Sequence, residues 1–101
     1  MAVVKSYRVG KLTQLVSPGD MKAFEYVNYH GYSPGETHEE HEHDDREEIF
    51  LCVGGKGALT GSLEREVGKG DIILISPGEV HGFVSDEDDP LEYICIASLL
   101  P

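Results

Sequence analysis

The sequence predicts an all-β fold, a small sandwich or barrel, and three observations support this prediction. Glycine and proline interrupt the chain at short and regular intervals, as at Pro34-Gly35 and Pro77-Gly78. The segments between these interruptions are short and rich in β-branched and aromatic residues, and none has a convincing long helical pattern. Short strands at this spacing are typical of β-sandwiches and barrels. A length of 101 residues corresponds to a single domain, residues 1–101.

Each strand is expected where an apolar run lies between two such interruptions. The first twenty residues have an ambiguous pattern and are expected to contribute no more than an edge strand. Residues 58–67, ALTGSLEREV, are expected to form a hairpin that turns near Gly61-Ser62. The other expected strands are the segments AFEYVNY (23–29), EIFLCV (48–53), DIILIS (71–76), VHGFVS (80–85) and LEYICIA (91–97).

The segment EIFLCV is apolar on both faces. Side chains alternate along a strand, which places Glu48, Phe50 and Cys52 on one face and the apolar residues at 49, 51 and 53 on the other. A half-exposed strand alternates apolar and polar residues, whereas a strand covered on both faces does not. In a chain of this size the second covering layer is expected to be another subunit, so the segment predicts a homodimer.

The chain is strongly acidic, with 19 Asp and Glu residues against 8 Lys and Arg residues and a formal net charge of −11. Binding to nucleic acid or to an anionic membrane surface needs clustered cations, so the composition argues against both. No apolar run is long enough to span a bilayer, and the N-terminal segment has no signal-peptide core. Cys52 and Cys95 are expected to be free thiols. We therefore expect a cytoplasmic protein.

The segment HEEHEHDDREE, residues 38–48, places three histidines among carboxylates. Such a segment can be a solvated acidic loop in which the histidines are incidental. However, His41 and His43 are two residues apart, so on a strand they share a face about 7 Å apart and can converge on one cation. His38 lies an odd number of residues from both, so on a regular strand it points the other way, whereas an irregular backbone here would change that. The spacing is one residue too short for the helical H-E-x-x-H zinc motif, and neither cysteine has a nearby partner for a zinc site.

A carboxylate ligand can come from the residues that follow this cluster. Residues 44–47 are expected to form a turn, after which Glu48 begins a strand on the face of Phe50. Glu47 lies on the opposite face of that strand. If the histidine face is the interior, Glu48 is therefore the better placed ligand.

A second candidate element is GDIILISPGEVHGF, residues 70–83. His81 follows a Pro-Gly turn there and begins a strand that has Phe83 on the same face. A single histidine near a turn is more often a surface or hydrogen-bonded residue than a ligand, so His81 alone is weak evidence for a site.

Together these segments resemble the two sequence motifs of the cupin superfamily. The first motif is glycine, five residues, H-x-H, three or four residues, glutamate, six residues and glycine. Residues 35–55 fit it with His41, His43 and Glu48. Glu47 fits the three-residue variant of the motif, so strand alternation is what favours Glu48.

The second cupin motif is glycine, five residues, P-x-G, two residues, histidine, three residues and asparagine. Residues 70–85 resemble it, with His81 at the histidine position. Ser76 and Ser85 replace the motif's proline and asparagine, and neither replacement touches the histidine.

The resemblance covers roughly residues 21–98 and implies a double-stranded β-helix, an antiparallel barrel-like sandwich, in a small single-domain cupin. It also implies a homodimer that binds a small-molecule substrate and one divalent transition metal per chain, one of Mn, Fe, Ni, Co, Cu and Zn. The metal ligands that it implies are His41, His43, Glu48 and His81.

The reaction is less constrained, because cupins include dioxygenases, sugar and phosphosugar isomerases, decarboxylases and lyases. A phosphorylated substrate needs arginine or lysine in the pocket, and none of the eight basic residues lies on the inferred inward faces. The inward candidates Phe50, Cys52 and Phe83 favour an apolar or aromatic ligand. We therefore expect a metal-dependent enzyme with dioxygenase-like chemistry. The alternatives are a sugar or phosphosugar isomerase and a non-catalytic small-molecule-binding protein, and the sequence assigns no role to His30 and His38.

Overall fold

The computed structural model describes residues 10–101, which form strands connected by turns and loops. In chain order the strands are β1 (Leu12–Val16), β2 (Tyr26–Gly31), β3 (Thr37–His41), β4 (Arg46–Gly54), β5 (Lys56–Gly61), β6 (Arg65–Gly68), β7 (Ile72–Ile75), β8 (His81–Ser85) and β9 (Glu92–Leu99). The described residues include no helix long and apolar enough to cross a membrane. The all-β class predicted from the sequence is confirmed.

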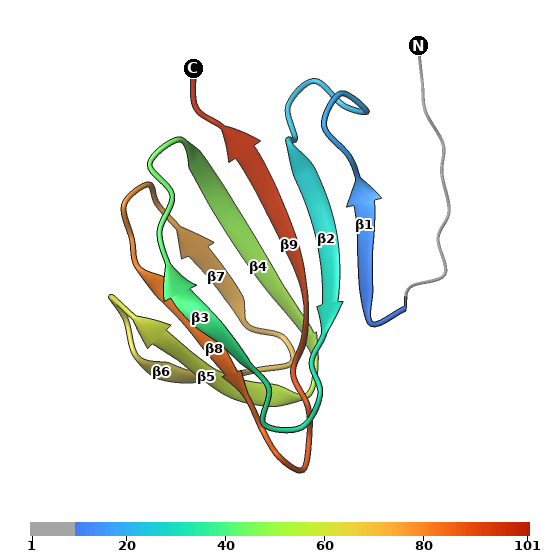
Figure 1. The fold of residues 1–101 in the computed structure, drawn as a ribbon, viewed down its shortest axis with the longest axis vertical. Helices are drawn as coiled ribbons and strands as arrows, with labels where there is room; N and C mark the ends of the chain where they lie inside the picture. Colours follow the sequence, from blue (N-terminus) through green and yellow to red (C-terminus); the bar gives the residue numbers. More distant parts are fainter. Residues whose placement is uncertain (1–9) are drawn as a thin grey trace.

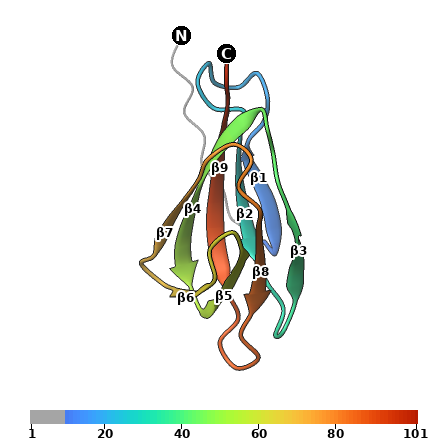
Figure 2. The same ribbon diagram turned by 90° about the vertical axis from the view of Figure 1, so that its left-hand side faces the viewer.

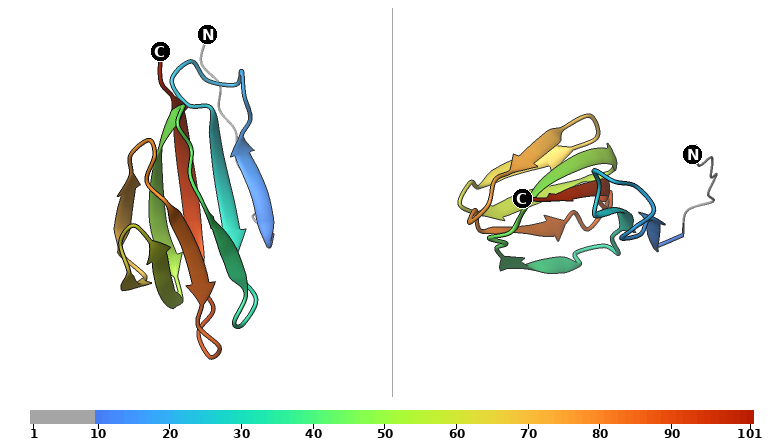
Figure 3. Two further views of the ribbon diagram at one scale, coloured as in Figure 1. Left: turned by 60° about the vertical axis from the view of Figure 1, so that its left-hand side comes forward. Right: turned by 90° about the horizontal axis from the view of Figure 1, so that it is seen from above.

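The strands form two antiparallel sheets that lie face to face (Figures 1 and 2). β1, β2, β9, β4 and β7 lie in this order in the first sheet, and β3, β8, β5 and β6 in the second. Strands that follow one another in the chain, such as β3 and β4, often lie in different sheets, and the view from above shows the chain passing between the two layers (Figure 3). This architecture is the double-stranded β-helix that the cupin motifs imply.

The core lies between the two sheets and is built by alternation along the strands. In β4 the inward positions Glu48, Phe50 and Cys52 are buried, as the sequence predicts. The second sheet contributes Leu59 and Phe83 to the same core. Each fully buried apolar side chain of this size stabilises the fold by about 1.5–3 kcal/mol. Among the buried residues of this core, Glu48 is charged, which marks its position as unusual.

The boundaries of β4 differ from the predicted ones without changing its phase. The strand begins at Arg46, two residues before the expected start, because Arg46 and Glu47 already pair with the end of the long strand β9. The turn expected at residues 44–47 is correspondingly shorter. Glu48 still faces inward and Glu47 outward, so the assignment of faces is correct.

Three other elements can be compared with the sequence prediction. The expected edge strand is confirmed as β1, which lies at one edge of the first sheet. The expected hairpin is confirmed as β5 paired with β6, with its turn at residues 62–64. The strand expected to carry both His41 and His43 is β3, THEEH, which ends at His41, so His43 lies in the following loop. Residues 37–40 are exposed and lack the apolar alternation that would fix β3 to the core. Its pairing with β8 holds it in the sheet instead.

The outward face of β4 is apolar and exposed. Ile49 and Val53 are 37% and 40% exposed, and Ile72 and Leu74 on the adjacent strand β7 are exposed further still. No strand or loop within residues 10–101 buries these side chains. The layer that the sequence predicts over this face is therefore not supplied by the described part of the chain, and the homodimer stays a prediction.

Candidate metal centre

Four side chains that could hold a metal ion lie together between the sheets. His41 ends β3, His43 follows it in the next loop, Glu48 lies in β4 and His81 begins β8. Each offers one ligand atom, and these atoms all lie within 4.8 Å of one another. Ligands bound at about 2.0–2.2 Å to one ion are about 3–4.4 Å apart, so a small closure of the cluster accommodates a shared cation. Glu48 and His81 are buried, while His41 and His43 are half-buried.

The pairing of β3 with β8 brings two of these histidines together. His41 and His81 are opposite one another in the antiparallel register, and their ring centroids are 4.3 Å apart. Gly82 makes the close approach possible, since a Cβ at this position would lie 2.7 Å from the His38 carbonyl oxygen. Glu48 comes from the opposite sheet, so the site bridges the two layers of the fold.

Backbone carbonyls orient the rings of His41 and His81. Nδ1 of His41 lies 3.0 Å from the Glu39 carbonyl oxygen, and Nδ1 of His81 lies 3.0 Å from that of Glu79. A carbonyl only accepts hydrogen bonds, so Nδ1 carries the proton and donates in both rings. The lone pair is then on Nε2, which is the atom that faces the cluster. This is the arrangement by which proteins fix the tautomer of metal-binding histidines.

Glu48 is held with its two oxygens in different roles. Oε2 accepts hydrogen bonds from the Tyr26 hydroxyl at 2.7 Å and from the Cys95 thiol at 3.4 Å. Oε1 lies 3.1 Å from Nε2 of His81 and 3.6 Å from Nε2 of His43. Burial by itself would raise the pKa of Glu48, but these hydrogen-bond donors outweigh it and lower the pKa to about 2. The carboxylate is therefore ionised at any physiological pH.

The donor atoms fit a divalent cation. Glu48 Oε1 and His81 Nε2 are both buried without a hydrogen-bond partner, although they are 3.1 Å apart. Two buried polar atoms left in this state are unfavourable unless a third group satisfies them. A proton on Nε2 would join them when the site is empty, and a cation bound to both would replace it. A set of imidazole and carboxylate donors suits the divalent transition metals.

The pKa values of the two histidines nearest Glu48, His81 and His43, are shifted in opposite directions. Burial lowers the pKa of His81, but the Glu48 carboxylate and the Glu79 carbonyl outweigh this effect and raise it overall. For His43 burial lowers the pKa and remains the dominant influence, despite the attraction of Glu48. Of these two histidines, His81 therefore holds its proton more strongly in the metal-free protein.

Three of the four candidate ligands, His41, His43 and Glu48, line a cavity of about 350 Å³. Phe50 and Phe83, both expected in the pocket wall, line it. Cys52 shares the inward face of β4 but lies beyond Phe50 in the packed core, 3% exposed, and is not part of the cavity wall. The described residues that line the cavity are Leu12, Tyr26, Asn28, His30, His38, His41, His43, Glu48, Phe50, Phe83, Tyr93 and Cys95.

Sequence reasoning missed one whole wall of this cavity. Tyr26, Asn28 and His30 alternate along β2 and all line the cavity. The signal was present, because the segment Y-x-N-x-H has polar and aromatic residues at every second position. Neither cupin motif includes this strand, so the motifs gave no indication that its residues belong to the site.

His38 also lines the cavity, contrary to the expectation that it points away from His41. The register of β3 against β8 shifts between His38 and His41, and this irregularity reverses the alternation. The two rings are stacked with centroids 4.9 Å apart. Nδ1 of His38 lies 3.4 Å from the Tyr32 hydroxyl and 3.5 Å from that of Tyr93.

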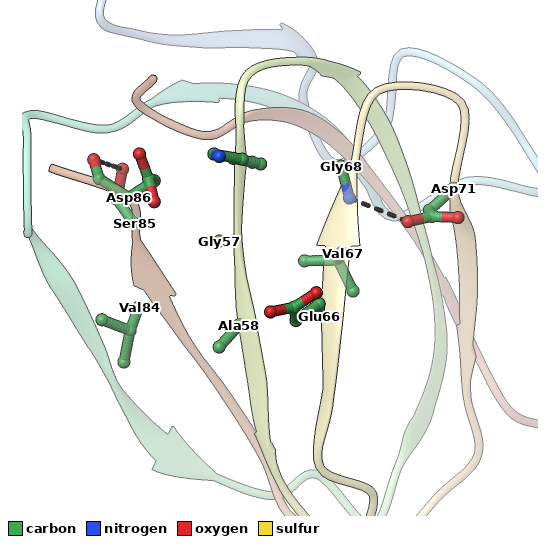
Figure 4. A pocket seen from close by; sticks show the side chains of 10 residues that line it. Gly57, Ala58, Glu66, Val67, Gly68, Asp71, Val84, Ser85 and Asp86 are labelled. Atoms are coloured by element: carbon green, nitrogen blue, oxygen red, sulfur yellow. Dashed lines mark hydrogen bonds between the residues drawn. The ribbon is translucent and has the colours of Figure 1, made fainter. Parts of the chain in front are cut away.

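A second hollow, of about 490 Å³, lies over β5, β6 and β8 (Figure 4). Ala58, Glu66 and Val84 line it, and Asp71 approaches from the loop after β6. Asp71 already accepts a hydrogen bond from the Gly68 amide at 2.8 Å. None of the buried unpaired side-chain atoms in the described residues belongs to this hollow, so it shows no sign of a ligand.

The fold and the cluster together define a double-stranded β-helix protein with a candidate metal centre of three histidines and one glutamate. The family model of the cupin domain matches residues 28–97, and the chain belongs to the cupin family. No curated protein sequence matches the chain.

Solved structures with the same fold include proteins of several activities. A cupin protein from Bacteroides fragilis has a TM-score of 0.82 at 23% identity, covering 98% of this chain and 86% of its own. A predicted oxalate decarboxylase from Thermotoga maritima has a TM-score of 0.78 at 22% identity, covering 88% and 79%. The polyketide cyclase RemF from Streptomyces resistomycificus has a TM-score of 0.75 at 22% identity, covering 96% and 83%. At these identities the likeness concerns the fold and not the reaction.

Proposed function

We propose that this cupin is a cytoplasmic, metal-dependent enzyme that carries out dioxygenase-like chemistry on a small, largely apolar or aromatic substrate. One observation carries the proposal: three of the four candidate ligands line a cavity with aromatic walls. Phe50, Phe83 and Tyr93 line this cavity, and none of its described lining residues is a lysine or an arginine. Two free, buried cysteines, Cys52 and Cys95, support the reducing compartment.

The chain's own residues prepare the site before any substrate arrives. His41 and His81 present Nε2 because backbone carbonyls hold their Nδ1 protons, and Tyr26 holds Glu48 so that Oε1 faces the histidines. His41, His43, Glu48 and His81 would hold a divalent ion through their side chains, and an ion that takes more than four ligands would also bind substrate or dioxygen. A divalent iron or manganese ion bound by this ligand set would supply Lewis acidity and electrons for chemistry with dioxygen. The aromatic wall binds an apolar body and excludes water from it.

Charge distribution makes a phosphosugar isomerase the weaker candidate. A phosphate group in the cavity would meet no cationic side chain among the described lining residues. A neighbouring hollow shares His30, His38 and His41 with the cavity and is also lined by three glutamates, Glu36, Glu39 and Glu40. These carboxylates repel an anionic substrate, whereas a neutral one approaches without this cost.

The proposal is tested by oxygen consumption. Protein purified without a His tag is loaded anaerobically with Fe²⁺ or Mn²⁺ and mixed with catechols, flavonols, β-diketones and thiols, and in parallel with hexose phosphates. We expect oxygen-dependent turnover of at least one neutral or aromatic compound. Glu48→Gln should abolish it, while Glu47→Gln, whose side chain is exposed, should retain it. Isomerisation of a sugar phosphate without oxygen, or tight ligand binding without turnover, would contradict the proposal.

A further inference from the structure

Three side-chain atoms among residues 10–101 are buried without a hydrogen-bond partner: Glu48 Oε1, His81 Nε2 and Asn28 Oδ1. Glu48 and Asn28 both line the cavity of about 350 Å³. Two of them, Glu48 Oε1 and His81 Nε2, are candidate metal ligands. The third is Oδ1 of Asn28 in β2, which the metal centre does not explain. Burying a carbonyl oxygen without a donor destabilises a folded protein, so an unpaired one facing a cavity calls for a specific partner.

The register of the first sheet places Asn28 away from the metal centre. Asn28 lies opposite Cys95, which in turn lies opposite Phe50, whereas Glu48 lies opposite Ala97 in the neighbouring row. β9 also separates β2 from β4, so the two outer strands are about 10 Å apart. The short Asn28 side chain therefore lines the cavity from the same sheet as Glu48 but two strands away, too far to be a further ligand of the same ion.

The polar neighbours of Asn28 already have partners. Nε2 of His30 lies 3.4 Å from a carboxylate oxygen of Glu36. Nδ1 of His38 contacts two tyrosine hydroxyls, which also bond to one another at 2.8 Å. Gln14, opposite Asn28 on β1, accepts a hydrogen bond from Ser17 at 3.1 Å. Apart from the candidate ligands, Asn28 Oδ1 is thus the buried acceptor in this cavity that awaits a donor.

We propose that Asn28 determines substrate specificity by accepting a hydrogen bond from a hydroxyl or N–H group of the substrate. The substrate would then be held at two points, with one end at the metal centre and a donor group at Asn28. Phe50, Phe83 and Tyr93 would contact the flat apolar body between them. The class of compound is a neutral aromatic or similarly flat molecule that carries a hydroxyl, amine or amide donor. The two-point arrangement rests on the proposed function, but the contact with Asn28 does not require the metal.

Phenol and toluene form a probe pair that isolates this contact, since they have nearly the same size and differ by one donor. Apolar cavities favour toluene, because phenol loses its hydrogen bonds to water on entering them. An acceptor in the wall reverses this order. We expect the full-length wild-type protein, with or without Zn²⁺, to bind phenol about tenfold more tightly than toluene in calorimetric or NMR titrations.

Asn28→Leu removes the acceptor at nearly constant volume, and we expect it to bind toluene more tightly than phenol. Asn28→Asp keeps an acceptor and should retain the preference for phenol. Gln14→Leu, which removes an exposed amide from the neighbouring strand, should behave as wild type. Because Asn28→Leu eliminates an unpaired buried oxygen, its melting temperature should be equal to or above that of wild type. A purely structural asparagine would instead lose stability on this change.

Three results would overturn the inference. They are equal affinities of wild type for phenol and toluene, an unchanged preference in Asn28→Leu, and a loss of Zn²⁺ affinity in Asn28→Leu, which would make Asn28 a metal ligand. Zn²⁺ binding is measured on the same samples. A chain that prefers phenol but binds no Zn²⁺ would contradict the proposed function and leave the role of Asn28 standing.

Discussion

The hydroxyl of Tyr26 donates a 2.7 Å hydrogen bond to Oε2 of Glu48, which lies 22 residues further along the chain. This contact decides which carboxylate oxygen is free. With Oε2 engaged, Oε1 is left facing the His81 and His43 rings at 3.1 and 3.6 Å. Tyr26 is therefore a positioning residue, because it orients a ligand rather than contacting the metal position itself.

Removing the Tyr26 hydroxyl should weaken metal binding. In Tyr26→Phe the Glu48 Oε2 atom keeps only the 3.4 Å contact with the Cys95 thiol. Loss of a partner that orients a ligand typically lowers metal affinity about 10–100-fold. The measurement is a Co²⁺ titration followed by the visible absorption of the bound ion. Tyr29→Phe, on the opposite face of β2, is the matched control and should bind as wild type; equal affinities of the Tyr26 and Tyr29 variants would remove the positioning role.

The two adjacent glutamates should respond differently to the same conservative change. Glu48 is 5% exposed and faces the histidines, whereas Glu47 is exposed on the outer face of β4. Glu48→Gln removes an anionic ligand and should lower Co²⁺ affinity by at least about 100-fold, while Glu47→Gln should change it less than twofold. If Glu47→Gln is the damaging variant, the inward and outward faces of β4 are the reverse of those in the structure. Phe50 would then not line the cavity.

Metal affinity should rise with pH between 6 and 8. The pKa of His81 is raised because Glu48 and the Glu79 carbonyl outweigh its burial, so the metal-free ring keeps its proton to a higher pH than an ordinary histidine does. A metal must displace that proton, and each displaced proton weakens binding about tenfold per pH unit below the pKa. Glu48, with a pKa of about 2, stays ionised and contributes nothing in this range. Calorimetry in two buffers counts the released protons.

The same raised pKa has the opposite effect on the stability of the metal-free protein. Protonated His81 is favoured in the folded state, so its contribution is fully present below about pH 6.5 and is lost as pH rises through the raised pKa. Metal binding therefore strengthens over the interval in which this stabilisation disappears. A metal affinity that stays flat from pH 6 to 8 would show that His81 carries no competing proton.

The exposed apolar face of the first sheet should be buried between two copies of the chain. Ile49 lies opposite Leu74, and Leu51 lies opposite Ile72, so apolar side chains form a continuous patch across β4 and β7. A two-fold symmetric contact would bury the patch of each copy against the other. Light scattering should give about twice the chain mass of 11.1 kDa at micromolar concentration.

Charge placed on this face tests the contact. Leu74→Glu should produce a monomer, because the dimer would bury an unpaired carboxylate. Leu63→Glu alters an exposed leucine in the turn between β5 and β6 and should remain dimeric. A wild-type protein that is monomeric at these concentrations would contradict the prediction.

The sequence predicted those parts of the site that depend on regular strands. The phase of β4 follows from simple alternation, so the choice of Glu48 over Glu47 could be made from the sequence. The position of His38 could not be predicted, because it depends on the register shift between β3 and β8, which leaves no mark in the hydrophobic pattern. Asn28 was missed for another reason. Its role depends on β2 and β4 lining the same cavity, and this follows from the strand order of the sheet and not from any local sequence pattern.

The pKa shifts of the histidines could not be predicted from the sequence either. Eight acids lie between Glu36 and Glu48, which suggests a general attraction for protons. In the structure most of them are exposed, and burial lowers the pKa of His30, His38 and His43. The raised pKa of His81 depends on one buried glutamate, and only the folded arrangement brings the two together.

Metal content per chain tests the central claim most directly. Untagged protein, loaded with Mn²⁺ and dialysed extensively, is analysed for bound metal together with the double variant His41→Ala/His81→Ala, whose folding is checked by circular dichroism. The account predicts one divalent ion per wild-type chain and none in the folded double variant. One ion per chain in both proteins would place the metal elsewhere and contradict the assignment of this centre.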